Sequence, residues 1–413
     1  MAEPHPLTVL PFVALLASIA GLPLLAPKFW SSNRNRALVT FGLAAPVALW
    51  IAYVDVQALL HTLGEYVSFI LLLGALFTVS GGVHVRGDLR GTPVVNLVVF
   101  GLGGVLANLL GTTGASMLLI RPLLRTNAQR ERVAHLPFFF ILIVSNCGGL
   151  LTPLGDPPLF LGYLRGVPFD WTLRLWPVWL FAMVWLLGLC YALDVRAYRS
   201  ESREAKLRDE RERVALGVDG WRQLPLLALV IGAVFLSSPL RELTLLGCAL
   251  VSAWIGPKRA HRGNHFEFAP LIEVAVLFAG IFVTMLPALA LLRSHGRALG
   301  LSEAWHFFLV TGALSSLLDN APTYLTFLSA AQALGERPDV IGVPHTFLAA
   351  ISVGAVVMGA NTYIGNGPNF MVKAIAESAN YRMPSFARYA LLAFLTLIPV
   401  YVFTMLWLAQ RVD

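Results

Sequence analysis

The chain has 413 residues, of which 57% are hydrophobic and 13% are charged, and its formal net charge is +7. Soluble domains carry roughly 25% charged residues, so this composition excludes an ordinary soluble protein. Apolar stretches of about 20 residues recur along the whole length, as a polytopic helical membrane protein requires. The basic residues lie in short loops between these stretches, which favours a signal for membrane orientation over a nucleic-acid-binding surface.

The cysteines and the amino terminus point to no further chemistry. The three cysteines lie inside apolar stretches without paired spacing, so we predict packing residues, not a disulfide framework or a metal site. The first ten residues lack the basic segment that opens a signal peptide. The first apolar stretch is therefore expected to stay in the protein as a helix.

Ten apolar stretches are predicted to span the membrane. In chain order they cover residues 7–26, 37–60, 66–83, 133–167, 172–195, 223–238, 240–256, 270–292, 344–378 and 386–409. Two further stretches, 92–124 and 303–333, are interrupted near their middles by GTTG and DNAP. Irregular backbone at membrane depth is tolerated only where protein or a wet cavity surrounds it. We therefore predict a re-entrant helical hairpin in each of these two stretches.

Two of the predicted spans, 133–167 and 344–378, contain a duplicated run of turn-forming residues. Residues 149–160 read GLLTPLGDPPLF and residues 359–370 read GANTYIGNGPNF. At a spacing of 210 they share Gly149/Gly359, Thr152/Thr362, Gly155/Gly365, Pro158/Pro368 and Phe160/Phe370. Matching breaks in the two halves of a membrane protein indicate the binding site of a transporter. We predict that both spans are broken helices.

The distribution of Lys and Arg predicts the orientation. With the amino terminus outside, the inside loops hold 21 of the 30 basic residues, in agreement with the positive-inside rule. These loops are 27–36, 84–91, 121–135, 196–222, 257–267 and 379–385. Residues 1–196 then form one repeat and residues 223–413 a second repeat of opposite orientation, joined by a charged cytoplasmic linker at 197–222. The expected fold is an all-α polytopic membrane protein with an inverted-topology repeat, each half having five spans and one hairpin.

Four irregular segments, the two hairpin tips and the two breaks, are expected to meet at the middle of the membrane. Glycine and proline free backbone carbonyls, which suit a dehydrated alkali cation together with Thr and Asn side chains. The amino ends of half-helices suit an anion instead, so the pattern predicts an ion site and leaves the sign of the ion open. The candidate residues are Asn108, Thr112, Thr113, Asn146, Thr152, Gly155, Asp156, Asp319, Asn320, Thr323, Asn361, Thr362, Gly365 and Asn366.

Asp156 and Asp319 are the two acidic residues of this set. A charge at mid-membrane costs at least about 2.5–3.5 kcal/mol on insertion scales, so it usually faces a functional cavity. A carboxylate there can compensate a sodium ion, and protonation would expel the ion. The alternative is that Asp156 caps the helix starting at Pro157, and that Asp319 or Asn320 caps the returning arm of its hairpin. Capping and ion binding are compatible.

The strings SNCGGLLTPLGDPP and SLLDNAPTYLTFLSA resemble those of NhaD-type sodium/proton antiporters and of the related citrate-transporter-like (CitMHS-like) and arsenite-pump members of the ion transporter superfamily. The resemblance extends over nearly the whole chain. The DNAP tip and the Gly-Asp pair of the first break are most similar to the antiporter branch. By this resemblance, sodium would bind Asp156 and Asp319, with Asn146, Thr112, Thr113, Asn320 and Thr362 as further candidates. It also implies a homodimer with an elevator-like movement.

The chain departs from the family pattern at two places. The first hairpin tip has no acidic residue, because Gly111 and Thr112 stand where the second tip has Asp319 and Asn320. This difference bears on the antiporter stoichiometry. The repeated Ser-Asn-Thr signature of sodium-coupled dicarboxylate carriers is also absent, which weighs against that branch.

The expected function is a sodium/proton antiporter that works by alternating access in the cytoplasmic (inner) membrane of a prokaryote. Sodium would be the transported or coupling ion, with no other cofactor and no nucleic-acid partner. The alternative is a sodium- or proton-coupled carrier of citrate, another carboxylate or arsenite. Glu273, near the inner end of its span, is either a proton-relay carboxylate or an interfacial glutamate. An enzyme is not expected, since the context of Asp156 differs from that of aspartyl intramembrane proteases and HExxH does not occur.

Overall fold

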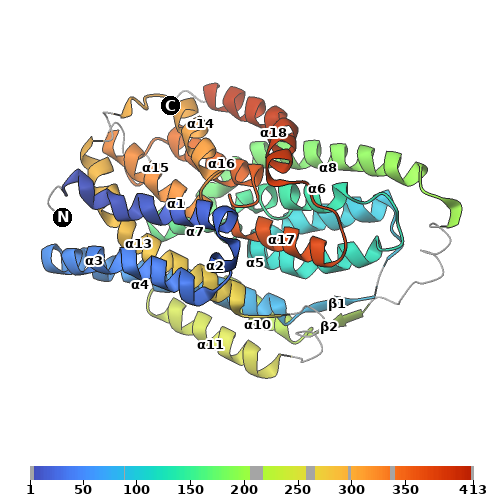
Figure 1. Ribbon diagram of the computed structural model, residues 1–413, viewed down its shortest axis with the longest axis horizontal. Helices are drawn as coiled ribbons and strands as arrows, with labels where there is room; N and C mark the ends of the chain where they lie inside the picture. The colour runs from blue at the N-terminus through green and yellow to red at the C-terminus, as the bar shows by residue number, and fades with distance from the viewer. Residues whose placement is uncertain are drawn as a thin grey trace.

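The computed structural model describes residues 4–87, 89–204, 217–256, 266–295, 299–334 and 340–410, and the structural statements below concern these residues. Helices dominate the described chain (Figure 1), and seven of them are long and apolar enough to cross a membrane. The protein is therefore a polytopic helical membrane protein, as the composition predicts. Most of the predicted linker, residues 205–216, lies outside the described residues.

The first half of the chain forms long helices and then a series of shorter ones. Its elements are η1 (Pro6–Val9), α1 (Leu10–Leu25), α2 (Pro27–Trp30), α3 (Asn33–Val54), α4 (Val56–Gly81), β1 (His84–Arg86), α5 (Pro93–Thr126), α6 (His135–Ile143), η2 (Cys147–Leu151), α7 (Pro157–Leu164), η3 (Phe169–Leu175) and α8 (Trp176–Arg199). The stretch predicted as one broken span contains α6, η2 and α7, with irregular backbone from Asn146 to Asp156.

The second half follows a similar order. Its elements are β2 (Gly217–Asp219), α10 (Gln223–Ala233), α11 (Leu240–Ile255), α13 (Ala269–His295), α14 (Ala304–Ser315), α15 (Asn320–Leu334), α16 (His345–Met358), η5 (Gly359–Asn361), α17 (Gly367–Ser378) and α18 (Phe386–Ala409). The strands β1 and β2 pair antiparallel, a small departure from the all-α expectation. They lie at the end of the molecule away from the amino terminus (Figure 1).

The helices pack against one another throughout the described fold (Figure 1). The helix α3 packs against α13; α4 packs against α11, α13 and α5; α5 also packs against α8 and α17; and α14 and α15 both pack against α16. The helix α16 is buried at every position after its first residue, as expected for a helix that is apolar on all sides. The outer helices instead expose large apolar side chains, such as Trp254 at 86%. This inside-to-outside arrangement suits a lipid environment.

The helix α5 is a hairpin bent at Gly111. Gly111 has φ 74° and ψ 156°, a region that is essentially restricted to glycine. A straight helix of this length would be about 50 Å long. Instead, the side chains of Asn96 and Asn127, from opposite ends of the segment, exchange hydrogen bonds of 2.9 and 2.8 Å. The corresponding segment of the second half consists of α14 and α15, which contact each other and are joined by residues 316–319.

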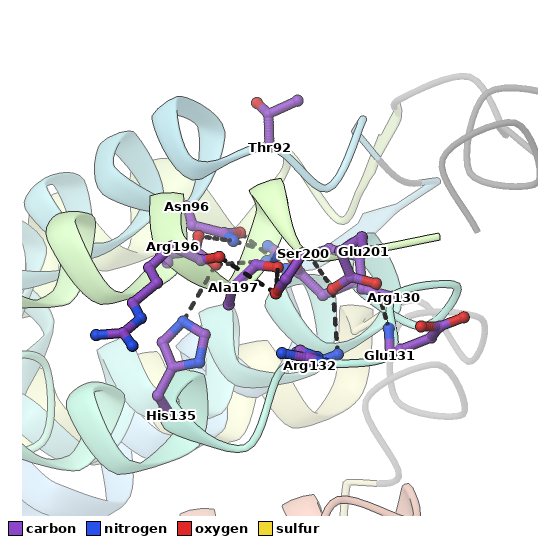
Figure 2. A network of polar contacts seen from close by, with 12 residues as sticks. Thr92, Asn96, Arg130, Glu131, Arg132, His135, Arg196, Ala197, Ser200 and Glu201 are labelled. Atoms are coloured by element: carbon purple, nitrogen blue, oxygen red, sulfur yellow. Dashed lines mark hydrogen bonds and ion pairs between the residues drawn. The ribbon is translucent and has the colours of Figure 1, made fainter. Parts of the chain in front are cut away.

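A buried polar network holds the base of this hairpin to the end of α8 (Figure 2). Arg130 Nη2 lies 2.6 Å from Asp194 Oδ1, and its Nε lies 3.4 Å from Glu201 Oε1. Asn96 donates a hydrogen bond of 2.8 Å to Asp194 Oδ2, and His135 Nε2 lies 3.1 Å from Asp194 Oδ1. The side chains of Arg130, Asp194 and Glu201 are at most 2% exposed. The network therefore joins α5, the start of α6 and the end of α8.

Each break brings two glycine backbones into direct contact. A Cβ at Gly155 would collide with the carbonyl oxygen of Gly149, and a Cβ at Gly149 would lie 2.6 Å from the Gly155 oxygen. In the second break, a Cβ at Gly365 would lie 2.5 Å from the Gly359 oxygen. The glycine pairs shared by the two sequence motifs are therefore required by close backbone packing.

Replacing Gly155 by alanine is expected to disrupt the first break, because the added methyl group has no space beside Gly149. Overpacking of this kind costs about 1–3 kcal/mol or more, so the thermal unfolding midpoint of the detergent-solubilised protein should fall. Gly188 on α8 is the matched control, since a Cβ there meets nothing within 4 Å. Equal midpoints for Gly155→Ala and Gly188→Ala would contradict the packing of the break.

Replacing Arg130 by alanine should lower the unfolding midpoint more strongly than replacing Arg132. The first change leaves Asp194 and Glu201 buried without their cation, a loss of about 3–5 kcal/mol. Arg132 is exposed, and its backbone N–H rather than its side chain donates to Glu201. Thermal unfolding of Arg130→Ala and Arg132→Ala in the same detergent measures the difference. A midpoint for Arg130→Ala at or above that of the control would show that the network does not hold the hairpin.

Candidate functional site

The side chain of Asp156 lies where both hairpins and both breaks meet. Its Oδ1 accepts a hydrogen bond of 2.8 Å from the Thr112 hydroxyl, next to the bend of α5, and one of 3.1 Å from Asn366 Nδ2 of the second break. Its Oδ2 accepts from Asn320 Nδ2 at the start of α15, at 2.5 Å. Asp156 is 1% exposed. Three segments distant in sequence therefore converge on one carboxylate of the first break.

The geometry rules out helix capping as the role of the Asp156 side chain. Asp156 occupies the N-cap position of α7, but its side chain accepts no hydrogen bond from that helix. The next two residues are prolines, which have no N–H to offer at the start of the helix. The capping interpretation of Asp156 is therefore wrong, since the carboxylate points to the other segments instead.

Asp319 has the opposite arrangement. Its Oδ1 accepts a hydrogen bond of 3.1 Å from the backbone N–H of Ala321, in the first turn of α15. The capping interpretation therefore fits Asp319. Its neighbour Asn320 is the residue of this tip that contacts Asp156.

Asn320 has an unused acceptor. The residue is 0% exposed, and its amide donates to Asp156, but its Oδ1 has no hydrogen-bond partner among the described residues. A buried polar atom without a partner costs about 1–3 kcal/mol, and such an atom in a native site calls for an explanation. An amide oxygen next to a buried carboxylate is a suitable ligand for a hard cation, which prefers oxygen atoms.

A chain of asparagine side chains links the two breaks. Asn366 Nδ2 lies 3.2 Å from Asn146 Oδ1, and Asn146 Nδ2 lies 2.7 Å from Asn369 Oδ1. Asn369 Nδ2 in turn donates to the backbone oxygens of Gly359 and Thr362, at 3.0 and 2.9 Å. The amides therefore fix the backbone of the second break relative to Asp156.

The two threonines shared by the motifs brace the breaks against the hairpins in the same way. The hydroxyl of Thr152 donates to the backbone oxygen of Asn108, and that of Thr362 donates to the backbone oxygen of Ser316 at 2.6 Å. The Asn108 side chain also accepts from the backbone N–H of Leu151, at 2.8 Å. These residues support the site by positioning backbone, and their side chains form hydrogen bonds within the protein.

The remaining candidates have other surroundings. Gly155 supplies a backbone oxygen that accepts from the Thr112 N–H at 2.8 Å. Asn361 bonds to the Ser316 hydroxyl at 3.0 Å, and Thr323 donates to the Asp319 backbone oxygen at 3.0 Å. Thr113 is half-buried and forms no hydrogen bond with the other candidates in the described part of the chain.

Glu273 lies away from this cluster. Its Oε2 is 3.1 Å from Arg36 Nη1, and its side chain is 36% exposed. This ion pair joins the start of α13 to the start of α3, which is the arrangement expected of an interfacial glutamate. No contact of Glu273 with Asp156 occurs among the described residues. The proton-relay role of Glu273 stays a prediction.

Asn369 lies in the second break, one turn beyond Asn366, and the sequence places it among the residues expected at mid-membrane. Two other supporting residues, Ser316 and Tyr401, were not among the predicted site residues. Ser316 lies three residues before the first residue of the DNAP string, and Tyr401 on α18 donates to Asn361 Oδ1 at 2.6 Å. No local pattern marks Tyr401, which stands in an otherwise apolar helix.

The site is built of oxygen and amide groups. In the described residues no group of three or more His, Cys, Asp or Glu side chains could hold a metal ion. The three donors to Asp156 are a hydroxyl and two amides, all neutral. The local charge of the site is therefore set by its carboxylates.

A comparison with known protein families identifies the family of the chain. A family model described as "Putative citrate transport" matches residues 2–409. No curated protein matches the chain. The family match covers both hairpins, both breaks and every residue around Asp156. The chain belongs to this family of citrate-transporter-like (CitMHS-like) ion transporters.

Proposed function

We propose that this protein is a secondary active transporter that exchanges sodium ions for protons at Asp156 by alternating access. The observation that carries the proposal is a fully buried carboxylate whose hydrogen-bond donors are all neutral. The family match supports the broader class of secondary ion transporter. It also agrees with the expectation that the chain is not an enzyme. The particular closeness to NhaD-type antiporters stays a prediction.

The charge of Asp156 explains why a cation and a proton would compete. Neutral donors reduce the cost of burying a carboxylate but do not cancel its charge. A sodium ion bound to Asp156 and to the free Asn320 Oδ1 would cancel it, and a proton on the carboxylate would do the same. Because either the sodium ion or the proton cancels the charge of Asp156, binding of one weakens binding of the other. This competition is the condition for exchange.

The arrangement of the site also suits alternating access. Asp156 is held from the first hairpin by Thr112, from the second by Asn320 and from the opposite break by Asn366. A movement of either hairpin would remove one donor and expose one side of the carboxylate. We propose that the two halves, 1–196 and 223–413, are related as an inverted-topology repeat, so that the hairpins open to opposite sides.

The contacts support the proposal that the loops assigned to the inside lie on one side of the membrane. The distribution of Lys and Arg is what places the amino terminus outside in this proposal. The strand β1 follows α4 and pairs with β2, which lies near the end of the charged linker, and both belong to loops assigned to the inside. The pair Arg36–Glu273 joins two helix starts that are also assigned to the inside. Segments predicted on one side of the membrane therefore meet in the fold. The location in a prokaryotic inner membrane and the homodimer stay predictions.

A second candidate function is a carrier of citrate or another carboxylate, and the family description favours it. The helices α7 and α17 both begin at the site, and helix amino termini attract anions. However, an ionised Asp156 would repel a carboxylate. Such a carrier would need a sodium ion or a proton at Asp156 before its substrate binds, so it would use the same carboxylate for coupling.

Proteoliposomes containing the protein should show proton movement when a sodium gradient is applied. Asp156→Asn should reduce this movement to that of protein-free liposomes, because the amide keeps the shape but carries no charge. Asp319→Asn keeps a capping side chain and tests the charge of Asp319 separately. Glu377→Gln is the control, since Glu377 is an exposed carboxylate paired with Lys373. Full exchange by Asp156→Asn would remove this carboxylate from the mechanism.

The second candidate is tested by uptake of citrate, succinate and arsenite with and without a sodium gradient. For an antiporter we expect no saturable uptake of these anions. Saturable citrate uptake, together with no cation/proton exchange when citrate is absent, would establish the carrier function instead. In that case Asp156→Asn should abolish the dependence of uptake on sodium or pH, because the coupling charge is lost.

A further inference from the structure

The duplicated breaks place different residues at the same position. Gly155–Asp156 in the first motif aligns with Gly365–Asn366 in the second. Both Asp156 and Asn366 occupy the N-cap of the following half-helix, and neither side chain caps it. Instead Asn366 Nδ2 donates to Asp156 Oδ1 at 3.1 Å. The repeat therefore brings together one carboxylate and one amide at its centre.

The amide of Asn366 occupies a position surrounded by oxygen atoms. Its Nδ2 lies 3.1 Å from Asp156 Oδ1, 3.1 Å from the backbone oxygen of Ser145 and 3.2 Å from Asn146 Oδ1. An amide nitrogen carries only two hydrogens, so three acceptors converge on a donor that can fully serve two of them. Asn366 is 2% exposed, and water does not reach it freely. Three convergent oxygens, one of them charged, are the surroundings that a small cation would have.

We propose that Asn366 limits this transporter to one coupling cation for each protomer, because its amide hydrogens fill the place that a second cation would otherwise take. This inference rests on the proposed function, in which the single cation binds at Asp156. It assigns a specificity-determining role to Asn366. Its uncharged amide, which donates hydrogen bonds to the surrounding oxygens, sets the number of coupling cations that bind. Within the Asp156–Asn366 pair, the carboxylate of Asp156 then has one charge to be compensated, by one sodium ion or one proton. Asp319 is counted separately, because its carboxylate accepts from the backbone of α15.

The consequence of adding a second carboxylate follows from charge. With aspartate at this position, two carboxylates would lie within hydrogen-bond distance, and such a pair does not ionise twice without compensation. At alkaline pH, where protons are scarce, the added charge and the three oxygens around it would favour a second sodium ion. Exchanging the two residues would restore the original pair of one carboxylate and one amide.

The test is the number of radioactive sodium ions bound by the purified full-length protein at alkaline pH. Charge compensation predicts about one ion per protomer for the wild type, about two for Asn366→Asp, and again about one for the double variant Asp156→Asn/Asn366→Asp. Asp156→Asn alone should bind none. Asn380→Asp is the control: it adds a carboxylate at an exposed position just after α17, outside the site, so about one ion is expected.

The outcomes separate the two proposals. A wild-type protein that binds no sodium, or that moves no protons when a sodium gradient is applied, would overturn the sodium/proton function itself. A wild type that binds one ion, with Asn366→Asp also binding one, would overturn only the role of Asn366. Two sodium ions bound by the wild type would also overturn the role of Asn366. This outcome can be measured even if none of the variants folds. A doubling confined to Asn366→Asp would establish the inference.

Discussion

The burial of the Asp156 carboxylate is the constraint on which the rest of the site depends. A carboxylate removed from water needs several donors, and no single helix can supply them. Here they come from the bend of α5, from the start of α15 and from the second break. The correct fold of both halves is therefore needed before the charge is accommodated.

Glycine makes this convergence sterically feasible. The bend at Gly111 turns α5 back on itself, so that Thr112 reaches Asp156 while the two ends of the helix meet at its base. The contacts between Gly149 and Gly155, and between Gly359 and Gly365, keep each break compact. Freed backbone oxygens of the hairpins, at Asn108 and Ser316, accept hydrogen bonds from the hydroxyls of Thr152 and Thr362 in the breaks. The irregular backbone of the breaks is therefore packed against other protein segments.

The polar interior is divided between two sets of residues. Around Asp156 the hydrogen-bond partners are neutral, so the charge of the carboxylate is not balanced by them. Around Asp194, at the base of the first hairpin, the partners include the guanidinium of Arg130, and the charge is balanced within the protein. The first arrangement suits a functional site and the second suits a structural support. Both proposed functions use the same physical step, namely the neutralisation of Asp156 before the site changes its accessibility.

The sequence alone determined the class of fold and the positions of its irregular segments. Composition identified the membrane helices, and the motifs around Gly155 and Gly365 located the two breaks, because turn-forming residues within apolar stretches act locally. The tertiary structure decided what each side chain does. Asp156 and Asp319 look alike in sequence, but one binds the other segments and the other caps a helix. The pairing of Asn146 with Asn369, 223 residues away, has no local signature. Hydrogen-bond partners of buried groups depend on how distant segments pack, and that information appears only when the chain is folded.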